Sequence, residues 1–102
     1  VNIQWLLEYA NKSSNQSGCL GIFGTSISAT WLATSLGKKV TFFVDEDVNR
    51  IGRTHMGKPI YDPMNKQIRD TKIIAPFRKD IGKNISLRHP MLDIVLPTDF
   101  YS

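Results

Sequence analysis

The stretch GIFGTSISATWLATSLGKKVTFFVDED, residues 21–47, has the pattern of a strand–helix–strand unit. The apolar run over about 18–23 predicts a first strand, and because it is apolar throughout we expect both of its faces to be covered, as in a parallel sheet. A second apolar run predicts a strand over about 39–45. A helical pattern lies between them, runs to about Leu36 and ends at the C-cap glycine Gly37. This order implies a right-handed crossover between parallel neighbours.

The helix of this unit has suitable residues at its start and along one face. Thr25 or Ser26 can serve as the N-cap, because its hydroxyl accepts a hydrogen bond from a backbone N–H of the first turn. Apolar residues at helical spacing predict the face that packs on the sheet. The side chains expected to point inward are Ile27, Trp31, Leu32 and Leu36.

The rest of the chain continues the alternation of strands and helical segments. Short strands are expected at 59–61 and 71–75, with a helical turn within 64–70 between them. A weak helix over 78–88 is followed by a final strand in LDIVLP, which ends at Pro97. The sum is an α/β fold, a three-layer sandwich around a small, mostly parallel sheet of four or five strands.

The 102 residues are enough for one domain. The chain begins with Val1, and IQWLLEYANK immediately after it is typical of a helix, with Trp5 and Tyr9 beside the apolar face. We therefore expect 1–102 to be a single domain and a C-terminal piece of a longer protein.

Composition narrows the classes of partner. The net charge is +4, with the charges spread along the chain, which suits an anionic small ligand and does not by itself indicate nucleic acid. The single cysteine, Cys19, excludes an internal disulfide and is expected to be a buried structural thiol. No apolar run approaches about 20 residues and no signal peptide is visible, so we expect a cytoplasmic protein without a membrane partner.

The glycine turn after the first strand is the first candidate site. A helix N-terminus at the carboxyl end of a parallel strand favours phosphate, and Gly24, Thr25 and Ser26 lie there. Asp45 ends the second strand, where an acid binds ribose hydroxyls in dinucleotide folds. Two alternatives stay open: any short turn favours a glycine and a cap, and Asp45 can instead accept from backbone N–H groups of its own loop. The turn also lacks the G-x-G-x-x-G spacing, which argues against NAD.

The loop DEDVNRIGRTHMGKPIYDP brings basic residues close to the acids. Arg50 and Arg53 are candidates to balance the charge of an anionic ligand, although a solvated basic rim is equally compatible. His55 has no second histidine or cysteine at ligand spacing, so no metal site is expected. His89 precedes a proline and is interpreted as a loop residue.

Phe77 is the remaining candidate. It follows Pro76 at the carboxyl end of its strand, on the same edge as the glycine turn, with two cations next to it in sequence. Such a set can stack a base and hold a phosphate. The alternative is a hydrophobic anchor at the start of a helix.

A family resemblance covers most of the chain. The sequence resembles the C-terminal Rossmann-like domain of sugar C-methyltransferases and related S-adenosylmethionine-dependent methyltransferases, and it is also similar to the N-terminal domain of sugar-nucleotide acyltransferases. The residues that carry this resemblance are Gly24, Leu36, Gly37, Val44, Asp45, Asp47, Arg50, Gly52, Gly57, Pro59, Ile60 and Pro63.

The resemblance implies an accessory domain that is not catalytic alone. It would hold a nucleotide-linked sugar or a similar anionic substrate and bind no cofactor itself, while S-adenosylmethionine would belong to an upstream catalytic domain. Two other hypotheses are an NAD(P)-binding Rossmann domain and an interaction domain without a small-molecule ligand, in which Trp5 and Tyr9 mark a docking face.

Overall fold

The computed structural model describes residues 19–77 and 79–96, so the expected leading helix, Trp5, Tyr9 and the tail lie outside the described residues. The elements along the described chain are β1 (Leu20–Phe23), α2 (Ile27–Leu36), the 3-10 helix η1 (Gly37–Lys39), β2 (Val40–Val44), β3 (Thr54–His55), β4 (Lys58–Tyr61), the 3-10 helix η2 (Lys66–Ile68), β5 (Lys72–Ile74), α3 (Lys79–Arg88) and β6 (Asp93–Val95). Each expected strand and helix in this part of the chain is present, with ends shifted by one or two residues.

The strands form one sheet in the order β3-β4-β2-β1-β5-β6. β1 pairs in parallel with β2 on one side and with β5 on the other, and the outer pairs β2–β4 and β5–β6 are also parallel. The two-residue β3 pairs antiparallel with β4 and brings the described sheet to six strands, against the four or five expected. The strands β2, β3 and β4 lie on one side of β1, and the later strands β5 and β6 lie on its other side. The strand order therefore switches at β1.

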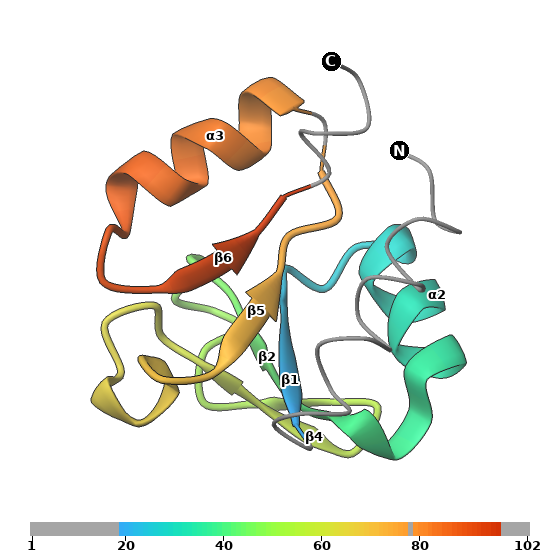
Figure 1. The fold of residues 1–102 in the computed structure, drawn as a ribbon. Helices are drawn as coiled ribbons and strands as arrows, with labels where there is room; N and C mark the ends of the chain where they lie inside the picture. Colours follow the sequence, from blue (N-terminus) through green and yellow to red (C-terminus); the bar gives the residue numbers. More distant parts are fainter. Residues whose placement is uncertain (1–18, 78, 97–102) are drawn as a thin grey trace.

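Two apolar clusters fill the spaces above and below the sheet. One contains the buried face of α2 together with Ile22, Phe43 and Ile74, and the other contains Ile85 of α3 together with Phe23. Figure 1 shows the sheet between α2 and α3. The result is the expected three-layer sandwich, because each face of the parallel strands is covered by a helix.

The buried face of α2 differs from the predicted one. Leu32 and Leu36 are buried as expected, whereas Ile27 is 90% exposed and Trp31 is 52% exposed. The buried stripe contains Ala29, Leu32, Ala33 and Leu36 instead. Positions i, i+3, i+4 and i+7 share one helix face, and in α2 this face includes two alanines, which bring the helix close to the sheet.

Both ends of α2 are capped as predicted. The Ser26 hydroxyl accepts a hydrogen bond from the Ala29 N–H at 3.2 Å, which identifies Ser26 rather than Thr25 as the N-cap. Gly37 follows the last residue with φ +62°, a conformation that favours glycine. The helix that connects β1 to β2 therefore begins and ends at residues that favour helix termini, Ser26 and Gly37.

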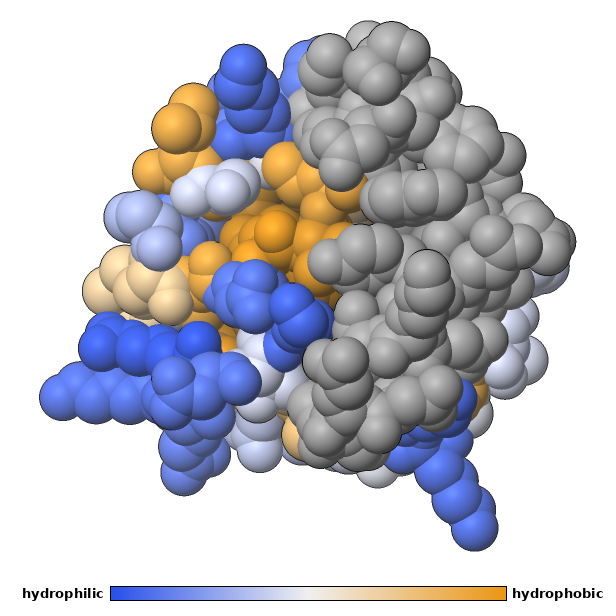
Figure 2. Space-filling view, viewed as in Figure 1, coloured by the Kyte–Doolittle hydropathy of each residue, from blue (hydrophilic) through white to orange (hydrophobic). Residues whose placement is uncertain are grey.

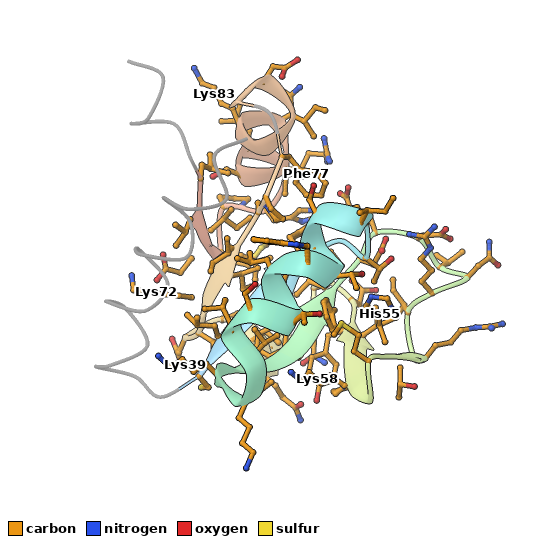
Figure 3. All side chains as sticks on the ribbon, turned by 90° about the vertical axis from the view of Figure 1, so that its right-hand side faces the viewer. Lys39, His55, Lys58, Lys72, Phe77 and Lys83 are labelled. Carbon is orange, nitrogen blue, oxygen red and sulfur yellow. The ribbon has the colours of Figure 1, made fainter. Side chains whose placement is uncertain are left out.

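The hairpin β3–β4 is fastened to the rest of the fold from two sides. His55 lies near Thr30 of α2, with 2.8 Å between Nε2 and Oγ1, and its ring meets Phe43 edge-on at 4.8 Å. Backbone hydrogen bonds join Ile60 to Gly52 and Arg53 across the loop. Figure 3 shows His55 beside α2. His55 therefore has a structural role, in holding the hairpin against α2 and Phe43.

The outer surface carries apolar and polar side chains side by side. Figure 2 shows apolar side chains in the middle of one face, where α3 passes over β6. Ile94 and Leu96 are partly buried against the second cluster.

Cys19, directly before β1, is half-buried rather than buried. None of the described helices is both long and apolar enough to cross a bilayer.

Candidate functional site

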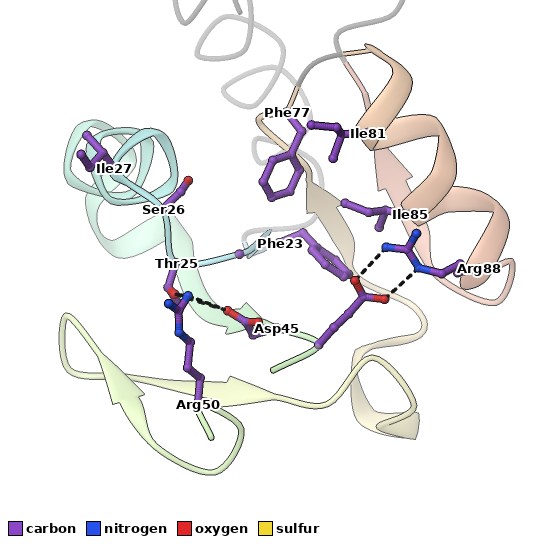
Figure 4. Close-up of a pocket in the computed structure, with 12 residues that line it drawn as sticks. Phe23, Thr25, Ser26, Ile27, Asp45, Arg50, Phe77, Ile81, Ile85 and Arg88 are labelled. Carbon is purple, nitrogen blue, oxygen red and sulfur yellow. Dashed lines mark hydrogen bonds and ion pairs between the residues drawn. The ribbon is translucent and has the colours of Figure 1, made fainter. Parts of the chain in front are cut away.

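A pocket of about 560 Å³ opens at the carboxyl ends of the strands, at the switch in strand order. Its lining comes from the residues that follow β1, β2 and β5, together with one face of α3 (Figure 4). Ligands of open parallel sheets bind at this position because the loops diverge there and leave a crevice. The lining residues are Phe23, Gly24, Thr25, Ser26, Ile27, Asp45, Glu46, Arg50, Phe77, Ile81, Ile85 and Arg88.

The glycine turn forms one edge of this pocket. Gly24 has φ +91°, and its N–H donates to the Val44 carbonyl at 2.6 Å, which holds the turn against β2. Ser26 satisfies two groups of the first helical turn, through its hydroxyl and its carbonyl. The N–H groups of Ile27 and Ser28 precede the first intrahelical bond and stay available to an anion.

Phe77 lies over the glycine turn. A Cβ added to Gly24 would come within 2.8 Å of the Phe77 ring, and the ring also meets Phe23 edge-on with centroids 6.4 Å apart. Glycine is therefore required at position 24 for two reasons: φ is positive, and a Cβ would clash with the Phe77 ring. In this arrangement Phe77 occupies the space through which a diphosphate would approach the Gly24 backbone.

Asp45 is nearly buried and holds a polar network on one wall. Its Oδ1 accepts from the Asp47 N–H at 2.9 Å, and its Oδ2 accepts from the Thr25 hydroxyl at 3.3 Å. Arg50 donates to the Thr25 Oγ1 at 2.7 Å and lies 3.5 Å from Asp45 and 3.6 Å from Asp47. The hydrogen bond from the Asp47 N–H confirms the backbone-capping interpretation of Asp45.

Glu46 builds a second network on the opposite wall. Its carboxylate accepts from Arg88 in a two-pronged arrangement, at 3.0 Å from Nε and 2.8 Å from Nη2. His89 Nε2 donates to the same carboxylate at 2.8 Å, and the His89 ring rests on Phe23. The hydrogen bonds from Arg88 are the main cause that lowers the pKa of Glu46; burial opposes this shift and His89 adds to it. The same contact raises the pKa of Arg88.

The third wall is apolar. Phe23 and Phe77 face the pocket from the sheet side, and Ile81 and Ile85 face it from α3. Figure 4 shows these side chains opposite Thr25 and Arg50. The pocket therefore has an apolar wall that suits a flat ring and a polar wall that suits hydroxyl groups.

Six of the seven predicted site residues meet at this pocket: Gly24, Thr25, Ser26, Asp45, Arg50 and Phe77. Arg53 does not, because it lies exposed in the loop before β3 and its backbone serves the hairpin. Sequence reasoning missed Glu46, Arg88 and His89. Glu46 carries no distinguishing signal within DED, because the bend after β2, which directs its side chain toward Arg88, is not evident from the sequence.

The described residues contain no group of three or more His, Cys, Asp or Glu side chains that could hold a metal ion. The acids of the pocket are instead neutralised by arginines. The pocket therefore offers a ligand hydrogen-bonding groups, charged side chains and an apolar wall.

No protein-family model matches the sequence, and no curated protein matches it. Among solved structures, the fold is similar to that of UDP-D-quinovosamine 4-dehydrogenase from Vibrio fischeri, with a TM-score of 0.58 and 21% sequence identity. The alignment covers 76% of this chain and 73% of that chain. At this identity the likeness shows the fold, an α/β sandwich of the Rossmann type.

Proposed function

We propose that this domain binds a nucleotide-linked sugar in the pocket at the carboxyl ends of β1, β2 and β5. The observation that carries the proposal is the composition of this pocket, in which a helix N-terminus, a polar wall around Asp45 and an apolar wall around Phe77 converge. A nucleotide sugar has three matching parts: a diphosphate, a hydroxylated sugar and a flat base. The fold neighbour, whose name refers to a UDP-linked sugar, agrees with this ligand class.

Each part of the ligand has a preferred wall. The sugar hydroxyls face Asp45, whose carboxylate is already oriented by Thr25 and the Asp47 N–H. The base lies against Phe77 and Ile81, where apolar and stacking contacts are favourable. The diphosphate links these two parts across the middle of the pocket, which Arg50, Arg88 and the N-terminal turn of α2 all line and where positive charge and the helix dipole favour an anion.

We propose further that the domain is the accessory part of a cytoplasmic, methyltransferase-like protein. The sequence resemblance supports this role, in which an upstream domain would bind S-adenosylmethionine and carry out the transfer. The pocket geometry is compatible with holding a substrate, since Asp45 is engaged with Arg50 and Glu46 with Arg88.

Calorimetric titration of the chain tests this function. The panel contains UDP, dTDP, GDP and CDP, their glucose conjugates, NAD, NADP and S-adenosylmethionine. We expect a preference for one nucleotide sugar over its nucleoside diphosphate, and a loss of that preference in Asp45→Asn. Equal binding of all compounds, or none, would contradict the proposal.

NAD(P) binding is the second candidate. The strand order with its switch at β1 and the dehydrogenase-type fold neighbour favour it. The Phe77 ring over Gly24 weighs against it, because the Rossmann pyrophosphate approaches the backbone of this turn closely. If NAD is the ligand, Phe77→Ala should tighten NAD binding by opening the turn. If a nucleotide sugar is the ligand, the same change should weaken binding by removing the stacking face.

A further inference from the structure

We infer that Arg88, rather than Arg50, binds the anionic group of the ligand. This inference rests on the proposed function and concerns the same pocket. Both arginines line the pocket, Arg50 from the loop after β2 and Arg88 from the last turn of α3 (Figure 4). Both are about half-exposed, so access alone does not distinguish them. The charged groups around each arginine distinguish them.

Arg50 lies in an environment with excess negative charge. Its guanidinium is 3.5 Å from Asp45 and 3.6 Å from Asp47, so two carboxylates surround one cation. If Arg50 turned toward a phosphate, both carboxylates would remain next to the phosphate without their counter-charge. Like charges at such distances repel, which disfavours an anion on this wall.

Arg88 has the opposite balance. Glu46 is its carboxylate partner in the described structure, and Glu46 also accepts from His89. The charges of Glu46 and Arg88 cancel. The surroundings of Arg88 are therefore neutral, whereas those of Arg50 are negative.

The second hydrogen bond to Glu46, from His89, lowers the free-energy cost of moving Arg88 from Glu46 to a ligand. The ring of His89 contacts Phe23, and its backbone N–H donates a hydrogen bond to the Ile85 carbonyl. These two contacts hold His89 in place. When Arg88 exchanges Glu46 for a phosphate, His89 still donates to the carboxylate at 2.8 Å. The planar fork that now fits a carboxylate with two hydrogen bonds fits two phosphate oxygens in the same way.

Three of the described lysines lie away from this pocket. Figure 3 shows Lys39, Lys58 and Lys72 far from Phe77, toward the amino ends of the strands. Lys58 donates to the Gly37 carbonyl there, and Lys72 pairs with Asp93. These three positive charges therefore do not compete with Arg88 for the ligand.

Titration of variants with inorganic pyrophosphate, UDP and UDP-glucose tests the inference, with uridine as the uncharged control. Arg88→Gln should weaken binding of the three anions by about tenfold or more and leave uridine unchanged, the size expected for charged hydrogen bonds. Arg50→Gln should change the anion affinities by less than about threefold, the scale of an exposed pair. The matched control Arg53→Gln, outside the pocket, should leave them unchanged.

Glu46→Gln separates ligand binding by Arg88 from a purely structural role. If Arg88 binds the phosphate, removing its competing carboxylate keeps or increases the affinity for UDP. If Arg88 only holds α3 in place through Glu46, both variants weaken binding alike, and the inference is wrong. Should Arg88→Gln fail to fold, Arg88→Lys keeps the charge without the fork and is expected to weaken UDP binding by about threefold to fivefold.

The inference and the proposed function fail in different ways. Wild-type binding of UDP-glucose that Arg88→Gln leaves intact overturns the inference alone. Pyrophosphate binding that depends on Arg88, without any preference for a nucleotide or its sugar, overturns the proposed function and supports the inference. No binding of any probe to the wild-type chain overturns both.

Discussion

Three consecutive acids follow β2, and their side chains divide between the two walls of the pocket. Asp45 and Asp47 face Arg50, while Glu46 faces Arg88. The three acids lie in the bend that follows β2, and this bend directs the Glu46 side chain away from those of Asp45 and Asp47. The sequence indicates that the acids lie at the edge of the sheet. It does not reveal the partner of Glu46, because Arg88 is 42 positions away in the chain.

Glycine at position 24 is required for two separable reasons. We expect Gly24→Ala to lower the free energy of unfolding by about 1–2 kcal/mol through its positive φ, and by a further amount because the new Cβ displaces the Phe77 ring. Urea unfolding measures both contributions.

The matched control is Gly52→Ala. Gly52 has φ +86°, but a Cβ there meets no atom within 4 Å, so only the backbone contribution should remain. The excess cost of Gly24→Ala should disappear in a Phe77→Ala background. An equal cost for the two alanine variants would show that the contact with Phe77 does not constrain the turn.

The lowered pKa of Glu46 makes one contribution to stability dependent on pH. Because the folded pKa lies below its ordinary value of 4.5, the stabilisation is complete above 4.5 and is lost as the pH falls through the folded value. Glu46→Gln should therefore be less stable than the wild type at pH 7. The two should converge in urea unfolding at a pH below the folded value.

Arg88→Gln removes the same ion pair from the other side and should give the same pH profile. Both side chains are well exposed, so the difference between wild type and variant should be small and should shrink with added salt. A difference between wild type and Glu46→Gln that persists unchanged into acid would contradict this origin of the pKa shift.

At the scale of elements, α2 shows where sequence periodicity misleads. Leu32 and Leu36 mark the buried face as predicted, but two alanines complete it, and Ile27 and Trp31 lie outside it. Trp31→Ser should change the free energy of unfolding by no more than about 0.5 kcal/mol, as for other surface positions. Leu32→Ala, one residue further on, should cost about 2–5 kcal/mol.

The same denaturation experiment checks both variants. A loss of several kcal/mol in Trp31→Ser would mean that Trp31 is part of the core after all. The sequence could not decide this point, because aliphatic and small residues occupy two adjacent stripes of the helix, and tertiary packing selects between them.

The N-cap of α2 gives a second test at this scale. Ser26→Ala should lower the free energy of unfolding by about 0.5–2 kcal/mol, because the Ala29 N–H loses its acceptor. Ser35→Ala, on the exposed side of the same helix, is the control and should be nearly neutral. If both variants behave alike, Ser26 does not cap the helix.

At the scale of the whole molecule, the parallel order of the sheet brings together residues that are far apart in sequence. Thr25, Asp45 and Phe77 each follow a different strand, and because parallel strands end at one edge, their meeting was predictable from the strand pattern. The contributions of α3 were not. Its apolar wall and Arg88 depend on how the helix lies over the sheet, which no local pattern specifies.

The most direct test of the nucleotide-sugar pocket is the map of amide chemical shifts during titration with UDP-glucose and dTDP-glucose. We predict shifts confined to Gly24–Ser28, Asp45–Arg50 and Phe77–Arg88, with Arg53 and the amino ends of the strands unchanged. Shifts spread over the outer face of α2 around Trp31, or no shifts at millimolar ligand, would contradict a ligand site at the switch in strand order.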